Sequence, residues 1–156
     1  MNEINQSRTP HGLDCRAARV VPAPPADVFR ALTDPQQMSA WWGKTAKTKL
    51  TSCDMDVRHD GSFRLAIQTP AGPEVVVSGV YTEVDPPYRL AFTWTSANYA
   101  DAVADSRVMI ELLDLKDGTT RAVVTQQDLP APSVVHVYSA GWHDMLQDLS
   151  LHFVGA

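Results

Sequence analysis

The last stretch of the chain, residues 133–154, is the feature that most constrains the fold. At about 100° of rotation per residue, its large apolar side chains fall within a sector of roughly 120°. We therefore predict one amphipathic helix about 30 Å long, capped by Ser133, with Asp144 and Asp148 turned towards the polar outer face. The predicted core-facing stripe consists of Val134, Val135, Tyr138, Trp142, Met145, Leu146, Leu149 and Phe153.

Such a helix needs a broad apolar surface to lie on, and the middle of the chain is predicted to form one as a sheet. Apolar and polar residues alternate there, and turn signals recur at short intervals. Asp60-Gly61 and Asp117-Gly118 are typical of hairpins, and successive hairpins make a sheet antiparallel. The predicted strands cover residues 50–57, 62–68, 74–85, 90–94, 108–112 and 122–126, with a longer loop at 97–105 that contains Tyr99.

The start of the chain adds one strand and two short helices. A β-like run covers residues 13–21, and prolines then lead into a helix at 25–32. Asp34 is predicted to cap a second helix, which ends at Trp41-Trp42-Gly43. The order of elements predicts an α+β fold, with a sheet of about seven strands packed against the final helix.

Size and charge limit the classes of function. The 156 residues suit one domain, predicted over 12–156 after a disordered polar segment at 1–11. A formal net charge of −5 argues against nucleic-acid binding, and no apolar run approaches the roughly 20 residues of a membrane-spanning helix. Cys15 and Cys53 are predicted to be free thiols in a cytoplasmic protein, since no signal-peptide pattern is present.

Several short segments carry a resemblance to a known family. They are Val28-Phe29-Arg30-Ala31-Leu32-Thr33-Asp34-Pro35, Trp41-Trp42-Gly43, Asp56-Val57-Arg58, Gly79-Val80-Tyr81-Thr82-Glu83-Val84, Arg89-Leu90-Ala91-Phe92-Thr93-Trp94 and Gly141-Trp142. In this order they resemble the START-like, helix-grip superfamily, also called SRPBCC or Bet v 1-like. Within it the chain is most similar to the small bacterial members of the family named for the activator of the heat-shock protein 90 ATPase.

The resemblance implies a curved antiparallel sheet wrapped round the C-terminal helix. It also implies a cavity between the two layers that binds a hydrophobic small molecule, and it suggests chaperone-related work. Two features depart from the family pattern. Asp60-Gly61 stands where paired glycines are usual, and the 97–105 loop replaces a short turn, so we expect a different pocket mouth.

Aromatic side chains from the strands and the final helix are predicted to face the same space, where they either fill a core or line a ligand cavity. Gln126 adds an inward polar group, and Met109 is an adaptable neighbour if its strand twists. Asp56 and Arg58 share a strand face and are predicted to pair, at the cavity rim or at the sheet edge. The predicted ligand-binding residues are Trp41, Trp42, Phe63, Tyr81, Phe92, Trp94, Met109, Gln126, Tyr138, Trp142 and Met145.

The sequence contains no recognisable set of nucleophile, base and orienting group, and no metal or cofactor motif. His136 and His143 are predicted on the outer face of the helix. The leading hypothesis is a non-enzymatic binder of an apolar or aromatic small molecule. Two alternatives remain: an enzyme resembling polyketide cyclases and aromatases that uses Gln126, Tyr81 and Arg58, and a chaperone-interacting module. An unpaired edge strand would also permit a homodimer.

Overall fold

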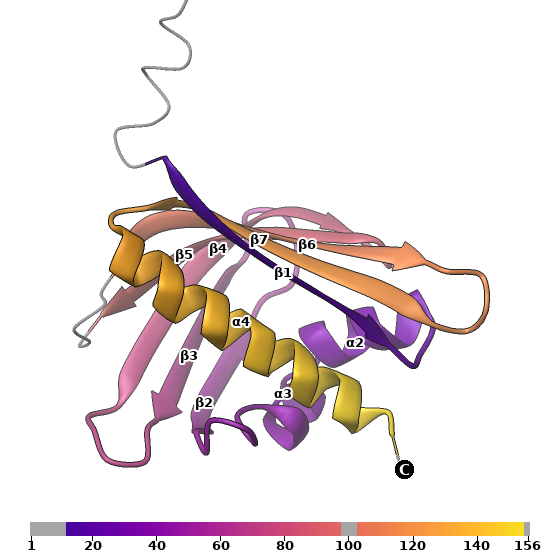
Figure 1. Ribbon diagram of the computed structural model, residues 1–156, viewed down its shortest axis with the longest axis horizontal. Helices are drawn as coiled ribbons and strands as arrows, with labels where there is room; N and C mark the ends of the chain where they lie inside the picture. The colour runs from indigo at the N-terminus through magenta and orange to yellow at the C-terminus, as the bar shows by residue number, and fades with distance from the viewer. Residues whose placement is uncertain (1–11, 98–102, 155–156) are drawn as a thin grey trace, which may run out of the picture.

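The computed structural model describes residues 12–97 and 103–154. Within them, seven strands form one antiparallel sheet in the order β1-β7-β6-β5-β4-β3-β2, and the long helix α4 crosses one face of it diagonally (Figure 1). This confirms the predicted α+β helix-grip architecture. The elements are β1 (Leu13–Val21), α2 (Pro25–Thr33), α3 (Pro35–Trp41), β2 (Lys49–Met55), β3 (Ser62–Gln68), β4 (Val75–Asp85), β5 (Arg89–Ala97), β6 (Val103–Asp114), β7 (Thr120–Leu129) and α4 (Pro132–His152).

The two short helices lie beside the C-terminal half of α4 (Figure 1). The Asp34 side chain accepts a hydrogen bond from the Gln36 amide at 3.0 Å, which confirms it as the cap of α3. Trp41 Nε1 donates to the Ala31 carbonyl oxygen at 2.9 Å, so a buried indole ties α3 to α2. The pair closes one end of the space between sheet and helix, and the residues that follow α3 reach that space.

Strand alternation decides which side chains face α4. In β5, Leu90, Phe92 and Trp94 are buried on the inner face, as their period-two spacing predicts. Gly79 in β4 is required by a close approach of two strands, because a Cβ there would lie 1.9 Å from the Thr93 carbonyl oxygen. The core is therefore one continuous layer between the sheet and α4.

Several predicted element boundaries differ from the observed ones, and two of the differences have a clear physical reason. Helix α4 begins at Pro132 with Ala131 as its N-cap and no capping side chain, because the fixed φ of proline suits the first helical position; Ser133 is therefore not the cap. The predicted 97–105 loop is shorter at both ends, since Ser96 pairs with Val103 and strand β6 continues through a positive φ of 54° at Asp105.

Some predictions concern parts of the chain outside the described residues. The disorder predicted for residues 1–11 and the position of Tyr99 belong to this group. Within the described ranges, no helix is long and apolar enough to cross a membrane.

Candidate functional site

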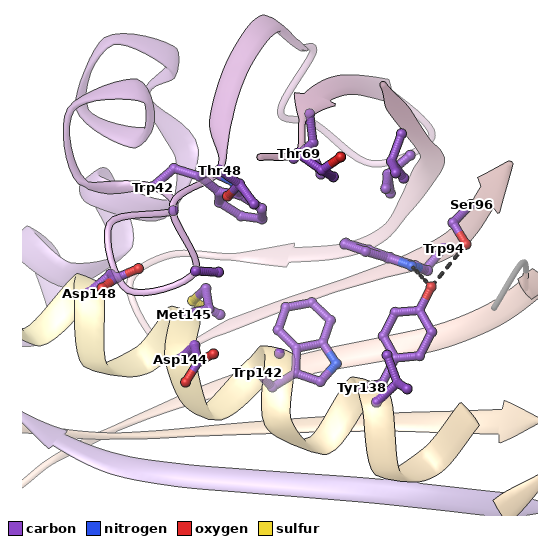
Figure 2. A pocket seen from close by; sticks show the side chains of 17 residues that line it. Trp42, Thr48, Thr69, Trp94, Ser96, Tyr138, Trp142, Asp144, Met145 and Asp148 are labelled. Carbon is purple, nitrogen blue, oxygen red and sulfur yellow. Dashed lines mark hydrogen bonds between the residues drawn. The ribbon is translucent and has the colours of Figure 1, made fainter. Parts of the chain in front are cut away.

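A cavity of about 220 Å³ lies between α4 and strands β3, β4 and β5. The segment that joins α3 to β2 covers one end of it (Figure 2). Most of its lining is aliphatic or aromatic. The lining residues are Trp42, Gly43, Ala46, Thr48, Ile67, Thr69, Val75, Val77, Trp94, Ser96, Val137, Tyr138, Gly141, Trp142, Asp144, Met145 and Asp148.

Aromatic rings form the inner wall of the cavity. The ring centroids of Trp94 and Trp142 are 5.1 Å apart with planes at 61°, and Tyr138 meets Trp94 edge-on at 6.2 Å. Trp42 reaches the space from the end of α3. Such tilted and edge-to-face contacts are the favoured geometry between aromatic side chains, so the wall is well packed behind the cavity.

A chain of buried hydrogen bonds holds this wall in place. Trp142 Nε1 donates to Gln126 Oε1 at 2.7 Å, and Gln126 Nε2 donates to Ser106 Oγ at 2.8 Å. Ser106 in turn donates to the Trp94 carbonyl oxygen at 2.9 Å. A fully satisfied buried network fixes its members in one arrangement. Gln126 therefore faces inward, as predicted, but its amide is committed to positioning the Trp142 ring.

A second polar contact lies at the end of the cavity near the N-terminal part of α4 (Figure 2). Trp94 Nε1 donates to the Tyr138 hydroxyl at 3.2 Å, and Ser96 Oγ lies 2.9 Å from the same oxygen. The backbone amide of Val103 donates to Ser96 Oγ at 3.3 Å. Two hydroxyl groups thus stand together in an otherwise largely apolar surface.

The carboxylate of Asp148 lies at the other end of the cavity, away from Tyr138 and Ser96 (Figure 2). Asp148 is only 3% exposed, which corrects the prediction that it faces outward. Its Oδ1 accepts hydrogen bonds from the Thr45 hydroxyl at 2.6 Å and from the Thr45 amide at 3.1 Å. The segment between α3 and β2 therefore covers Asp148 and is held to α4 by it. Asp144, one turn earlier, is half-buried and also lines the cavity.

Gly141 and Ala46 are the lining residues that are exposed, so we place the mouth of the cavity beside them. A Cβ built on Gly141 would meet no atom within 4 Å. The helix therefore has open space in front of it at this position. Because Gly141 has no side chain, this space in front of the helix stays unfilled.

The other predicted aromatic residues pack more tightly. Phe63, Tyr81 and Phe92 line a separate void of about 40 Å³, room for about one water molecule. The centroids of Phe63 and Phe92 are 5.3 Å apart with planes at 82°, and Tyr81 is 2% exposed. Burial raises the pKa of the Tyr81 hydroxyl well above its ordinary value. Trp42, Trp94, Trp142 and Met145 line both spaces and separate them.

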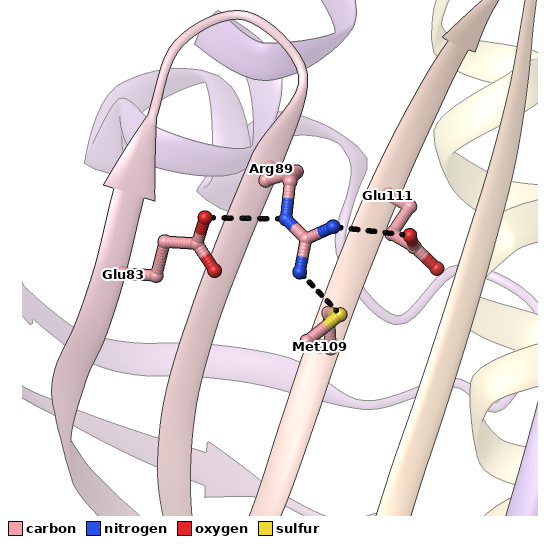
Figure 3. Close-up of polar contacts among 4 residues, drawn as sticks. All are labelled: Glu83, Arg89, Met109 and Glu111. Carbon is pink, nitrogen blue, oxygen red and sulfur yellow. Dashed lines mark hydrogen bonds and ion pairs between the residues drawn. The ribbon is translucent and has the colours of Figure 1, made fainter.

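Met109 does not face the cavity, and its predicted inward role was wrong. Its neighbours Val108 and Ile110 point inward, so alternation turns Met109 to the outer face of the sheet. There its sulfur accepts a hydrogen bond from Arg89 Nη2 at 3.2 Å (Figure 3). Arg89 also pairs with Glu83 and Glu111, at 3.2 and 3.5 Å. Glu83 and Glu111 are thus half-buried ion-pair partners of Arg89.

Three further predicted site residues lie away from the cavity. Trp41 is buried between the short helices and lines neither space. Asp56 and Arg58 form an ion pair of 2.9 Å in the exposed turn after β2, not at the rim. The strand predicted to carry them ends at Met55, so they bind each other in solvent.

Several cavity residues were not predicted although the sequence contains their signal. Ile67, Val75 and Val77 occupy inward positions of the strand alternation, and Ser96 follows Trp94 by two residues and therefore shares its face. The segment 43–48 has no periodicity, so nothing in the sequence predicted that it would reach the cavity.

The other titratable side chains of the described residues form no metal site. Within residues 12–97 and 103–154, no three His, Cys, Asp or Glu side chains gather as a metal site. Cys15 and Cys53 are free, as predicted. Burial is the main cause that raises the pKa of both thiols, which lowers their thiolate fraction and their reactivity.

The sequence matches the family described as activator of Hsp90 ATPase homolog 1-like protein over residues 22–153. The chain belongs to this family. The match spans both short helices, the cavity strands and α4, which agrees with the resemblance noted from the sequence. A comparison with curated proteins found no match.

Solved structures of bacterial proteins share the fold. Mll3558 of Rhizobium loti has 20% identity and a TM-score of 0.76, covering 91% of this chain and 97% of that one. NE0264 of Nitrosomonas europaea has 27% identity and a TM-score of 0.71, covering 90% and 93%. DynU16, a protein in the dynemicin biosynthetic locus, has 22% identity and a TM-score of 0.69, covering 91% of this chain and 47% of DynU16.

Proposed function

We propose that the protein binds a small apolar or aromatic molecule in the cavity between α4 and strands β3 to β5. The main support is the cavity of about 220 Å³, lined by Trp42, Trp94 and Trp142. A dry apolar cavity of about 150 Å³ holds one benzene molecule, so this space suits a ligand of one or two rings. Specific sites of this kind combine apolar walls with a few placed polar groups.

The residue at the cavity mouth adds support. A glycine in a helix interior costs about 1 kcal/mol relative to alanine. Nothing within 4 Å would obstruct a side chain at Gly141, so packing does not explain the glycine. Passage of a ligand past α4 does explain it, because any larger residue narrows the entrance.

The proposal is tested by titration with N-phenyl-1-naphthylamine, a neutral dye that fluoresces in apolar surroundings. We expect saturable binding of one dye per chain, with a change in tryptophan emission. Gly141→Leu should weaken binding at least tenfold, because the leucine fills the mouth. Ala140→Leu is the matched control, since Ala140 is the exposed neighbour of Gly141 and does not line the cavity.

Two results would contradict the proposal. The first is a linear, non-saturable dye signal from the natural protein. The second is an equal loss of binding in Gly141→Leu and Ala140→Leu, which would place the dye on the helix surface. Thermal unfolding of each variant, followed by circular dichroism, verifies that both keep the fold.

The alternatives are less well supported. The cyclase hypothesis relied on Gln126, Tyr81 and Arg58, and none of them lines the main cavity. Chaperone binding rests on the family description alone. Measuring the ATPase rate of Hsp90 with micromolar amounts of this protein tests it separately, and an unchanged rate would count against an activator role.

A further inference from the structure

One short segment stands apart from the helices and strands that build the cavity. Residues 44–47 follow α3 and precede β2, and all four are exposed. The segment covers the end of the cavity beside Asp148 (Figure 2). Ala46 lines the cavity and is one of the two exposed residues beside which we place the mouth. The position of the segment therefore sets the width of the entrance.

The hydrogen bonds that tie residues 44–47 to the fold all go to one side chain. The Thr45 hydroxyl donates to Asp148 Oδ1 at 2.6 Å. The Thr45 amide donates to Oδ1 and Oδ2 of the same carboxylate, at 3.1 and 3.3 Å. Among the described residues, no other hydrogen bond joins this segment to the rest of the protein. Asp148 is thus its polar anchor on α4.

The two ends of the segment are held together at its base. The Thr48 amide donates to the Gly43 carbonyl oxygen at 2.9 Å, and a Cβ on Gly43 would overlap Thr48. The backbone has positive φ angles at both ends, 79° at Gly43 and 59° at Lys47. Residues at the ends of a moving segment absorb its change in backbone angles. Residues 44–47 can therefore swing about this base while α3 and β2 stay in place.

The anchor can close the segment without closing it permanently. Asp148 is 3% exposed and forms no ion pair among the described residues. Removing a carboxylate from water costs free energy, which offsets a large part of what its hydrogen bonds to Thr45 contribute. When the segment swings away, water replaces Thr45 on the carboxylate. Exposed segments with few buried contacts also open far more readily than the fold as a whole.

We propose that residues 44–47 form a gate over the mouth of the cavity, held closed by the hydrogen bonds between Thr45 and Asp148. This inference rests on the proposed function. Opening breaks these bonds and moves Ala46 away from the entrance, so that a ligand enters or leaves. Because Thr45 does not line the cavity, its bonds hold the gate equally over an empty and a filled cavity. Thr45 therefore controls the rates of binding and release, and not the affinity.

Stopped-flow mixing with N-phenyl-1-naphthylamine tests the gate, since it measures the association and dissociation rate constants separately. Thr45→Val keeps the size of the side chain and removes its hydroxyl. Both rate constants should rise about tenfold, because a hydrogen bond to a charged group changes an equilibrium constant by about that factor. Their ratio, Kd, should change by less than about twofold. Thr45→Ser keeps the hydroxyl and should retain the natural rate constants.

Thr51→Val is the matched control for the loss of a hydroxyl group. Thr51 is an exposed threonine of β2, and its hydroxyl also donates to a carboxylate, Glu74 Oε2, at 2.7 Å. Thr51 does not line the cavity. Its replacement should therefore leave both rate constants unchanged.

Amide hydrogen exchange of the ligand-free protein tests the movement itself. The amide of residue 45 donates to Asp148, whereas the Thr48 amide donates to Gly43 at the base of the gate. In Thr45→Val, the protection factor of the residue-45 amide should fall about tenfold, since the gate is open more of the time. The protection factor of the Thr48 amide should not change, because the base stays closed.

The outcomes separate this inference from the proposed function. If the natural protein binds no dye, the proposed function fails and this inference fails with it. If the dye binds saturably but Thr45→Val has the natural rate constants, the cavity binds ligands and the gate is wrong. A faster dissociation alone, with Kd weakened in proportion, would show that Thr45 retains the ligand without controlling its entry, and would overturn the inference. Equal effects of Thr45→Val and Thr51→Val, or an equal loss of protection at the Thr48 amide, would also overturn it.

Discussion

Replacing Gly141 by alanine should stabilise the protein, although the residue lies at the candidate binding site. Gly141 is in the interior of α4, with a full turn of helix on either side. Its φ is not in the left-handed region that only glycine adopts readily. A Cβ would meet no atom within 4 Å, so the change costs no packing energy.

The magnitude follows from helix propensity. Alanine is favoured over glycine by about 0.8–1.0 kcal/mol in a helix interior. For a chain of this size, that gain corresponds to a rise in Tm of about 2–4 °C. Thermal unfolding followed by far-ultraviolet circular dichroism, with urea titration for the free energy, measures both quantities. Ala140→Gly is the mirror-image control, and should lose about as much as Gly141→Ala gains.

One result would refute this reasoning. If Ala140→Gly lowers the unfolding free energy as expected but Gly141→Ala also lowers it, then the glycine is required by the fold. In that case the open space at Gly141 is not evidence of an entrance, and the support it gives to ligand binding disappears.

Three further predictions address buried contacts in the core. Asp148→Ala should lower the unfolding free energy by about 2 kcal/mol, because charge-assisted bonds to Thr45 are lost; Asp148→Asn, which keeps an acceptor, should lose less in the same urea titration. Gly79→Ala should destabilise by about 3 kcal/mol, since the added methyl meets the Thr93 carbonyl oxygen, and an unchanged Tm would show that β4 and β5 can separate. Because burial raises the pKa of Tyr81, the phenol stays neutral in the folded state while the unfolded state ionises near pH 10, so stability should fall as pH rises above 10. Tyr81→Phe should make this fall shallower in unfolding measured from pH 8 to 11.

The fold followed from local patterns that tertiary contacts did not override. Strand β5 carries Leu90, Phe92 and Trp94 on one face, and α4 carries one apolar stripe. Only one orientation of each element buries these apolar side chains. The same alternation predicts that Met109 faces outward, because its neighbours Val108 and Ile110 face inward. The prediction for Met109 was wrong because it assumed that strand twist would turn the side chain inward against the alternation.

The site was harder to predict because it depends on contacts between segments far apart in the sequence. Asp148 is buried by Thr45, which lies 103 positions earlier in a segment without periodicity. Whether aromatic residues enclose a space or fill it depends on how their rings pack in three dimensions. Thus Phe63 and Trp94 share the same strand alternation, yet only Trp94 borders the cavity of about 220 Å³.

The pairing of β1 with β7 has a consequence for how the chain folds during synthesis. Val21 at the end of β1 pairs with Thr120 at the start of β7, so the sheet cannot be completed until about a hundred further residues have been made. At about 5–20 residues per second, that interval is roughly 5–20 s. Throughout it, β1 exposes both of its backbone edges to the cell, and α4 emerges later still. A chain stalled before β7 would therefore present an unpaired strand that a chaperone or another copy can bind.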